Sequence, residues 1–132
     1  MKDFDLSEFL GEWQVRRRIS DAQTGLVTRF QGTAQISDNA FHETGMIQFQ
    51  NQRLSSQRQY LLEWGDGVVE VRRPDGSPFI TLESQGIQRV VHHCGDDLYR
   101  GLFMFASNRR WAEIWTVRGP RKNYRSVSQY RR

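Results

Sequence analysis

The chain has 132 residues, of which 37% are hydrophobic and 26% are charged, and its formal net charge is +4. This length can bury a core without metals or disulfides, so we expect a single domain covering residues 1–132. The composition excludes a disordered or fibrous chain, and no apolar run is long enough for a membrane-spanning helix.

The N-terminal segment predicts a short helix, whereas the rest of the chain predicts strands. In residues 5–11, Asp5 can cap a helical turn, Glu8 completes a capping-box spacing and Gly11 ends the turn. After Gly11, short runs of alternating polar and apolar residues are separated by clusters of turn-forming residues. These runs predict strands near residues 12–20, 27–36, 40–49, 55–63, 67–73, 78–83, 87–94, 98–106, 110–118 and 123–131.

Many short strands joined by tight turns indicate an all-β fold. Because tight turns join antiparallel neighbours, we expect an up-and-down antiparallel β-barrel of about 8–10 strands, closed to remove its edges. The basic segment 109–132 also alternates, which predicts two final strands rather than a disordered arm.

Four predicted strands carry an ionisable residue on the face that also carries the apolar side chains. Side chains of a strand alternate between two faces, so each of these residues belongs with the apolar set, although a slip of one residue would reverse the assignment. An unpaired buried charge is costly, and four together indicate a polar cavity inside the barrel. The four are Arg17, Glu43, Arg58 and His92.

The start and end of the chain resemble the lipocalin-like (calycin) superfamily. Gly11-Glu12-Trp13 opens the first predicted strand, and the last predicted strand is rich in Arg. In that superfamily the Trp packs under an Arg from the end of the barrel. The resemblance therefore implies that Trp13 packs under Arg125, Arg131 or Arg132.

More closely, the chain resembles an uncharacterised bacterial family of small lipocalin-like proteins, nearly from end to end. This resemblance implies a fold but no activity. Its motifs are Gly11-X-Trp13 with Arg17 and Asp21, Glu43 with Gly45, His92-X-Cys94-X-X-Asp97-Leu98-Tyr99, and Trp115-X-Val117-X-Gly119-Pro120-Arg121-Lys122-X-Tyr124 with Tyr130-Arg131.

Arg17 and Arg58 are the natural pair for binding an anion inside the predicted barrel. Each charge-assisted hydrogen bond to a carboxylate or phosphate contributes about 1.5–3 kcal/mol. Alternatively, Glu43 neutralises one of them in a structural ion pair, although one carboxylate cannot neutralise two Arg. Other candidates to line or flank the cavity are Tyr60, Tyr99, Trp115, Lys122, Tyr124 and Tyr130.

His92 is a candidate general base, oriented by Asp97 or Glu43. The simpler hypothesis is a hydrogen-bonded structural His. No metal site is expected, because no second ligand pair accompanies His92 and Cys94. No cofactor is predicted either, with haem on His92 as a remote alternative.

The sequence therefore predicts a protein that binds a small, anionic and partly apolar molecule. The first alternative is an enzyme of the isomerase, cyclase or lyase type, using His92 or Glu43 as acid/base. The second, less favoured, is nucleic-acid binding by the basic C-terminal segment. The lone Cys94 and the lack of a signal peptide predict a cytoplasmic protein. We expect no membrane partner, and the oligomeric state, homodimer included, stays open.

Overall fold

The computed structural model describes residues 5–132. Within them the chain forms one 3₁₀ turn and ten strands, and the bounds of each strand lie within three residues of those predicted. The elements are η1 (Leu6–Phe9), β1 (Gly11–Asp21), β2 (Val27–Ile36), β3 (Ala40–Phe49), β4 (Gln52–Trp64), β5 (Val68–Arg72), β6 (Pro78–Glu83), β7 (Ile87–Cys94), β8 (Asp97–Ser107), β9 (Arg110–Gly119) and β10 (Lys122–Arg131).

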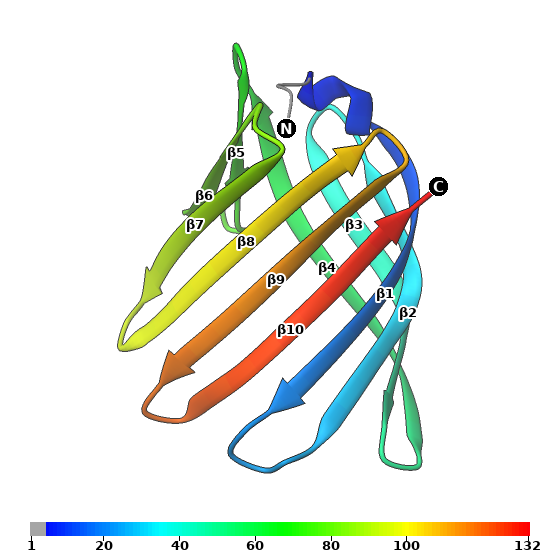
Figure 1. The fold of residues 1–132 in the computed structure, drawn as a ribbon, viewed down its shortest axis with the longest axis vertical. Coiled ribbons are helices and arrows are strands. Elements are labelled where there is room, and N and C mark those ends of the chain that lie inside the picture. Colours follow the sequence, from blue (N-terminus) through cyan, green and yellow to red (C-terminus); the bar gives the residue numbers. More distant parts are fainter. Residues whose placement is uncertain (1–4) are drawn as a thin grey trace.

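All strands belong to one antiparallel sheet that curls into a nearly closed barrel (Figure 1). Its order is β6-β5-β4-β3-β2-β1-β10-β9-β8-β7, so every strand pairs with its chain neighbours except at the junction of β1 and β10 and at the two edges. The predicted all-β, up-and-down antiparallel barrel is therefore confirmed. The predicted N-terminal helix is a single 3₁₀ turn, and the side chain of Asp5 caps it by accepting from the N–H of Ser7 at 2.9 Å.

The two edge strands, β6 and β7, meet without a backbone ladder between them. Side chains of β7 bond the backbone of β6 instead. The Gln88 side chain accepts from the N–H of Glu83 at 2.8 Å and donates to its carbonyl at 2.7 Å. Nδ1 of His92 lies 3.1 Å from the carbonyl of Phe79. We call this junction the β6/β7 seam, and it is the one place where the described barrel depends on side chains for closure.

The turn η1 covers one end of the barrel, where the first and last strands meet (Figure 1). Leu6 and Phe9 of this turn are buried in the core. Phe9 stacks on Trp13, whose indole N–H donates to the Phe9 carbonyl at 2.9 Å. Trp13 thus links the N-terminal turn to the first strand.

Arg132 is the C-terminal arginine that packs on Trp13. Its guanidinium carbon lies 4.1 Å from the centre of the indole ring, and Nη1 donates to the carbonyl of Leu10 at 2.7 Å. Of the three candidates that the resemblance left open, the structure selects the last residue of the chain. Among residues 5–132, no helix has the length and apolar character needed to cross a membrane.

Candidate functional site

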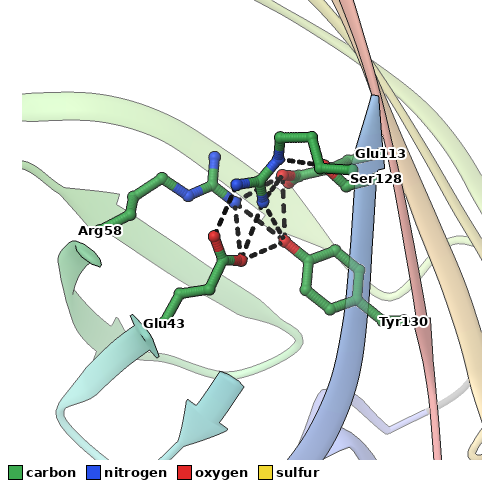
Figure 2. Close-up of polar contacts among 6 residues, drawn as sticks. Glu43, Arg58, Glu113, Ser128 and Tyr130 are labelled. Atoms are coloured by element: carbon green, nitrogen blue, oxygen red, sulfur yellow. Dashed lines mark hydrogen bonds and ion pairs between the residues drawn. The ribbon is translucent and has the colours of Figure 1, made fainter. Parts of the chain in front are cut away.

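Six polar side chains meet inside the barrel. Figure 2 draws them as sticks and labels all of them except Arg17. Strand register brings them together, because Glu43 pairs directly with Arg58 across β3 and β4, and Ser128 pairs with residues of both β1 and β9. Alternation then turns all of them toward the interior. The six are Arg17, Glu43, Arg58, Glu113, Ser128 and Tyr130.

Arg17 uses every nitrogen of its guanidinium. Nη1 and Nη2 donate to the two carboxylate oxygens of Glu43 at 2.7 and 2.9 Å, and Nε donates to the hydroxyl of Ser128 at 2.6 Å. The guanidinium also stacks on the ring of Phe30, 5.1 Å from its centre. Phe30 itself has room only because residue 45 is glycine, since a Cβ there would lie 2.8 Å from its ring.

Arg58 uses only one of its three nitrogens. Nη2 donates to Glu113 at 2.6 Å, to the hydroxyl of Tyr130 at 2.9 Å and to Glu43 at 3.4 Å. Its buried Nε has no hydrogen-bond partner within residues 5–132. The side chain is 26% exposed, against 9% for Arg17. Arg58 therefore has N–H donors without a partner, whereas every guanidinium nitrogen of Arg17 donates a hydrogen bond.

Tyr130 is the centre of the network. Its hydroxyl donates to Glu43 at 2.7 Å and accepts from Arg17 and Arg58. Burial, together with the carboxylate of Glu113, raises the pKa of Tyr130 well above 10, so the phenol stays protonated and can donate. Burial alone would raise the pKa of Glu43, but Arg58 and Arg17 outweigh it and hold that pKa below 4.5. Glu43 is therefore ionised near neutral pH.

The charges of the network cancel, because two Arg face two Glu. With Glu43 as the one predicted carboxylate, one Arg would stay unneutralised, and an anionic ligand was expected for that reason. Glu113 supplies the second carboxylate, 2.6 Å from Arg58 and 3.7 Å from Arg17. Its signal was present in the sequence, since Glu113 lies on the same strand face as Trp111 and Trp115. A structural ion-pair network therefore accounts for the charges of Arg17, Arg58 and Glu43 without a ligand.

A cavity of about 80 Å³ lies beside this network and is lined largely by apolar side chains. Arg58 and Glu113 form its polar part. Trp64 and Trp111 also line it, and their indole N–H groups are buried and have no partner within residues 5–132. The other lining residues are Leu6, Phe9, Ile36, Phe41, Tyr60, Leu62, Val69, Val71, Phe79, Ile80, Leu82, Phe103, Phe105 and Trp115.

The predicted site residues lie in three places, which are the interior network with its cavity, one end of the barrel, and, for His92, the β6/β7 seam. Arg17, Glu43, Arg58 and Tyr130 meet in the network, and Tyr60 and Trp115 line the cavity with Arg58. Lys122, Tyr99 and Tyr124 form a second cluster. It lies near the start of β10, at the end of the barrel opposite η1 (Figure 1).

In this second cluster Nζ of Lys122 donates to the hydroxyl of Tyr99 at 3.1 Å and lies 3.2 Å from the carboxylate of Asp97. The hydrogen bonds to Tyr99 and Asp97 raise the pKa of Lys122, so its ammonium stays charged. Burial and the neighbouring Tyr99 raise the pKa of Tyr124 to about 12. Lys122 therefore neutralises Asp97 at the barrel end and is not part of the interior network.

His92 lies at the β6/β7 seam and outside the network. Nε2 lies 2.8 Å from Nη2 of Arg73, and Nδ1 bonds the carbonyl of Phe79. The expected orienting partners, Asp97 and Glu43, are not the ones observed; Arg73 arrives from the turn after β5. Burial and the positive charge of Arg73 lower the pKa of His92, which favours a neutral ring accepting from Arg73. As an acid/base or a haem ligand, His92 would first have to give up one of these contacts.

No group of three or more His, Cys, Asp or Glu within residues 5–132 is arranged to hold a metal ion. Cys94 is partly buried. The residues that sequence reasoning missed are Glu113, Ser128, Trp64, Trp111 and Arg73. Only Glu113 carried a signal of the kind that identified the others, a charge in alternation with apolar residues.

Comparisons with known proteins support the fold and leave the activity open. Residues 9–132 match the model of a family of unknown function, DUF6314. A search of curated proteins finds no significant match.

Two examples illustrate the similarity of fold to solved structures. The S-type phycobiliprotein lyase CpeS from Guillardia theta is 9% identical, with a TM-score of 0.63 over 96% of this chain and 89% of that one. A protein of unknown function from the DUF3598 family of Nostoc punctiforme PCC 73102 is also 9% identical, with a TM-score of 0.62. This chain is covered to 98% and spans about half (49%) of that protein. At such identities the similarity concerns the fold alone.

Proposed function

We propose, from the premise that this chain belongs to the DUF6314 family, a family of unknown function, that its barrel binds a small, largely apolar molecule. The ligand would place a hydrogen-bond acceptor against Arg58. The observation that carries this proposal is the guanidinium of Arg58. Its buried Nε has no hydrogen-bond partner within residues 5–132, whereas all three nitrogens of the neighbouring Arg17 are hydrogen-bonded.

An unsatisfied buried donor costs about 1–3 kcal/mol, so three of them around one cavity need a compensating partner. Arg58, Trp64 and Trp111 each contribute one such N–H and each line the same cavity. A ligand with one or more acceptor oxygens would satisfy them. The aromatic and aliphatic walls would bury the rest of the molecule, as in most small-molecule sites.

The ligand that fits this site best is uncharged. The sequence predicted an anion, but the two Arg of the network are balanced by Glu43 and Glu113. A carboxylate would lose more hydration on entry than a carbonyl would, and no net positive charge remains to offset that loss. We therefore favour a carbonyl or ether oxygen over a carboxylate as the group that meets Arg58.

The cavity is smaller than the range of about 300–1,000 Å³ that is typical of ligand pockets. At about 80 Å³ it must expand to accept anything beyond a few atoms. The β6/β7 seam is where expansion costs least, because side chains and not a backbone ladder hold it. Phe79, Ile80 and Leu82 of β6 line the cavity, so movement of this strand enlarges it directly.

We also propose that the chain is a lipocalin-like protein of the cytoplasm. The support for the superfamily is the packing of Trp13 under Arg132, the arrangement that the resemblance implied. The cytoplasmic location rests on the sequence alone.

Native mass spectrometry of the protein purified from its own host tests the ligand proposal. Wild type and Arg89→Lys, a control on an exposed position of β7, should retain the same small molecule. Arg58→Lys preserves the charge balance but removes the planar guanidinium. This variant should retain at least about tenfold less of the molecule, the effect of one lost hydrogen bond. Val71→Phe, which fills the cavity and leaves the network intact, should lose it as well.

Retention of the molecule by Val71→Phe would place it outside the cavity and contradict the proposal. So would a wild-type protein that carries no ligand and whose Tm does not change with a panel of small aromatic ketones and ethers.

A further inference from the structure

The outer face of the barrel carries a groove that runs over five adjacent strands, β10, β1, β2, β3 and β4. Its volume is about 640 Å³, far larger than that of the interior cavity. Exposed side chains that point away from the core provide its polar lining. These are Arg16, Arg18, Arg29, Gln31, Gln48, Arg53 and Gln129.

Strand register arranges these side chains in rows across the strands. In one row Arg18 of β1 pairs with Arg29 of β2, Arg29 with Gln48 of β3, and Gln48 with Arg53 of β4. In the adjacent row Arg16 pairs with Gln129 on one side and with Gln31 on the other. Neighbouring strands lie about 4.8 Å apart, so the guanidinium groups of one row can reach a common ligand.

The groove is positively charged and unneutralised. None of its four exposed Arg forms an ion pair within residues 5–132, and no described Asp or Glu lines it. Arg18 lies directly opposite Arg29, a like-charge cross-strand pair that destabilises a sheet. The interior shows the reverse arrangement, with one Glu for each Arg. This like-charge arrangement lowers the stability of the fold, and a bound anion would offset the repulsion.

We propose that this groove binds a small molecule that carries two or more neighbouring phosphate groups. The planar fork of Arg matches the oxygens of a phosphate bidentately, and several forks in a row match several phosphates. The volume of the groove lies within the range of small-molecule sites. Its apolar residues Met46 and Val127 leave a surface for the rest of the ligand.

A nucleic acid strand fits the groove less well than a small phosphate ligand. Proteins that bind single strands use exposed aromatic side chains on which the bases stack. The large apolar side chains that are exposed within residues 5–132 are all aliphatic, and Phe30, the one aromatic of the groove, is only 4% exposed. The groove can hold phosphates but offers no platform for bases.

Isothermal titration calorimetry with inorganic tripolyphosphate, at about 0.15 M salt so that long-range fields are screened, tests the proposal. Wild type should bind, and Arg18→Gln/Arg29→Gln should bind at least tenfold more weakly. The control Arg100→Gln/Arg118→Gln removes the same two charges from exposed positions of β8 and β9, outside the groove, and should bind as wild type does.

Three results would overturn the proposal. Wild type that binds no tripolyphosphate excludes the site, and equal weakening in both double variants assigns the binding to overall charge. A 12-nucleotide single-stranded DNA that binds more tightly than tripolyphosphate at the same salt makes the groove a nucleic-acid surface. Because all four substituted residues are exposed, matching circular dichroism spectra suffice to show that each variant is folded.

Discussion

At the scale of single residues, Glu113 decides the character of the interior. With Glu43 alone the network would hold an unneutralised Arg, and an anionic ligand would be required to complete it. With Glu113 at 2.6 Å from Arg58 the network is neutral and can exist without a ligand. What remains for a ligand is hydrogen bonding to Arg58, which changes the expected chemistry from ion pairing to acceptor recognition.

The charge balance leads to the first prediction. Glu113→Gln keeps the shape of the side chain but leaves Arg17 and Arg58 with one carboxylate, so the free energy of unfolding should fall by about 2–4 kcal/mol. Urea denaturation measures it. Glu12→Gln, at an exposed position of β1, should change the same quantity by less than about 0.5 kcal/mol.

The double variant Glu113→Gln/Arg58→Met separates charge from packing. Removal of both partners leaves Arg17 paired with Glu43, so the double variant should be more stable than Glu113→Gln alone. A double variant whose loss equals the sum of the single losses would show that Glu113 and Arg58 are not energetically coupled.

At the scale of elements, the β6/β7 seam is the weak point of the barrel. Nine of the ten possible neighbour contacts around the barrel are backbone ladders, and the tenth depends on Gln88 and His92 of β7. Gln88 is buried, and its side-chain amide both accepts from the N–H of Glu83 and donates to the Glu83 carbonyl, as a neighbouring strand would. Since local opening draws on the least stable contacts, ligand entry should occur here.

The second prediction concerns this seam. Gln88→Leu removes the bonds to the N–H and carbonyl of Glu83 and should speed amide hydrogen exchange at Glu83 by about thirtyfold, the effect of roughly 2 kcal/mol for two hydrogen bonds. Exchange monitored by nuclear magnetic resonance measures it residue by residue. Arg89→Gln, at the next and outward-facing position, should leave the rate at Glu83 unchanged.

The exchange of amides in the β1–β10 ladder provides the internal reference. These amides should keep wild-type rates in Gln88→Leu, because the backbone ladder there is intact. Faster exchange in both places would indicate global destabilisation and would contradict a local role for Gln88.

At the scale of the whole molecule, two ionisable groups make stability depend on pH in the same direction. Burial and Arg73 lower the pKa of His92 below its usual 6.5, and Arg58 and Arg17 hold the pKa of Glu43 below 4.5 despite burial. In both cases the folded chain binds fewer protons than the unfolded chain between the two pKa values. Stability is therefore full above the unfolded pKa and is lost as the pH falls through the folded pKa.

The third prediction follows from these signs. The Tm should begin to fall as the pH drops below about 6.5, by less than about 4 °C for His92, and should fall further below about 4.5 as Glu43 is protonated. Scanning calorimetry from pH 8 to pH 3 measures both steps. His92→Gln, which can still bond Arg73 and Phe79, should lose the first step only, whereas His42→Gln, at an exposed site, should keep both. A first step that persists in His92→Gln would assign it to another group.

The distribution of charge over the whole molecule separates two sites. The inner face holds Arg and Glu in equal number beside a small apolar cavity, whereas the groove on the outer face of β1 to β4 and β10 is lined by four exposed Arg and by no described carboxylate. The net charge of +4 therefore comes from the surface and not from the interior network.

The strands and the inward residues could be predicted because both depend on local patterns. Alternation within a strand turned Arg17, Glu43 and Arg58 inward, and the turn clusters marked where each strand ends. The partners of these residues could not be predicted, since Arg73 reaches His92 from a turn 19 positions earlier and Tyr130 bonds Arg17 across 113 positions. Which C-terminal Arg covers Trp13 was open for the same reason.

The sequence by itself determined that this chain is an all-β, up-and-down antiparallel barrel, and which side of most strands faces inward, because backbone periodicity and turn chemistry act over a few residues. Only the tertiary structure decided that the network is neutral, that the seam between β6 and β7 is held by Gln88 and His92, and that four outward Arg share one groove. Those outcomes depend on strand order and register, which place side chains distant in the sequence at hydrogen-bond distance only once the sheet has closed on itself.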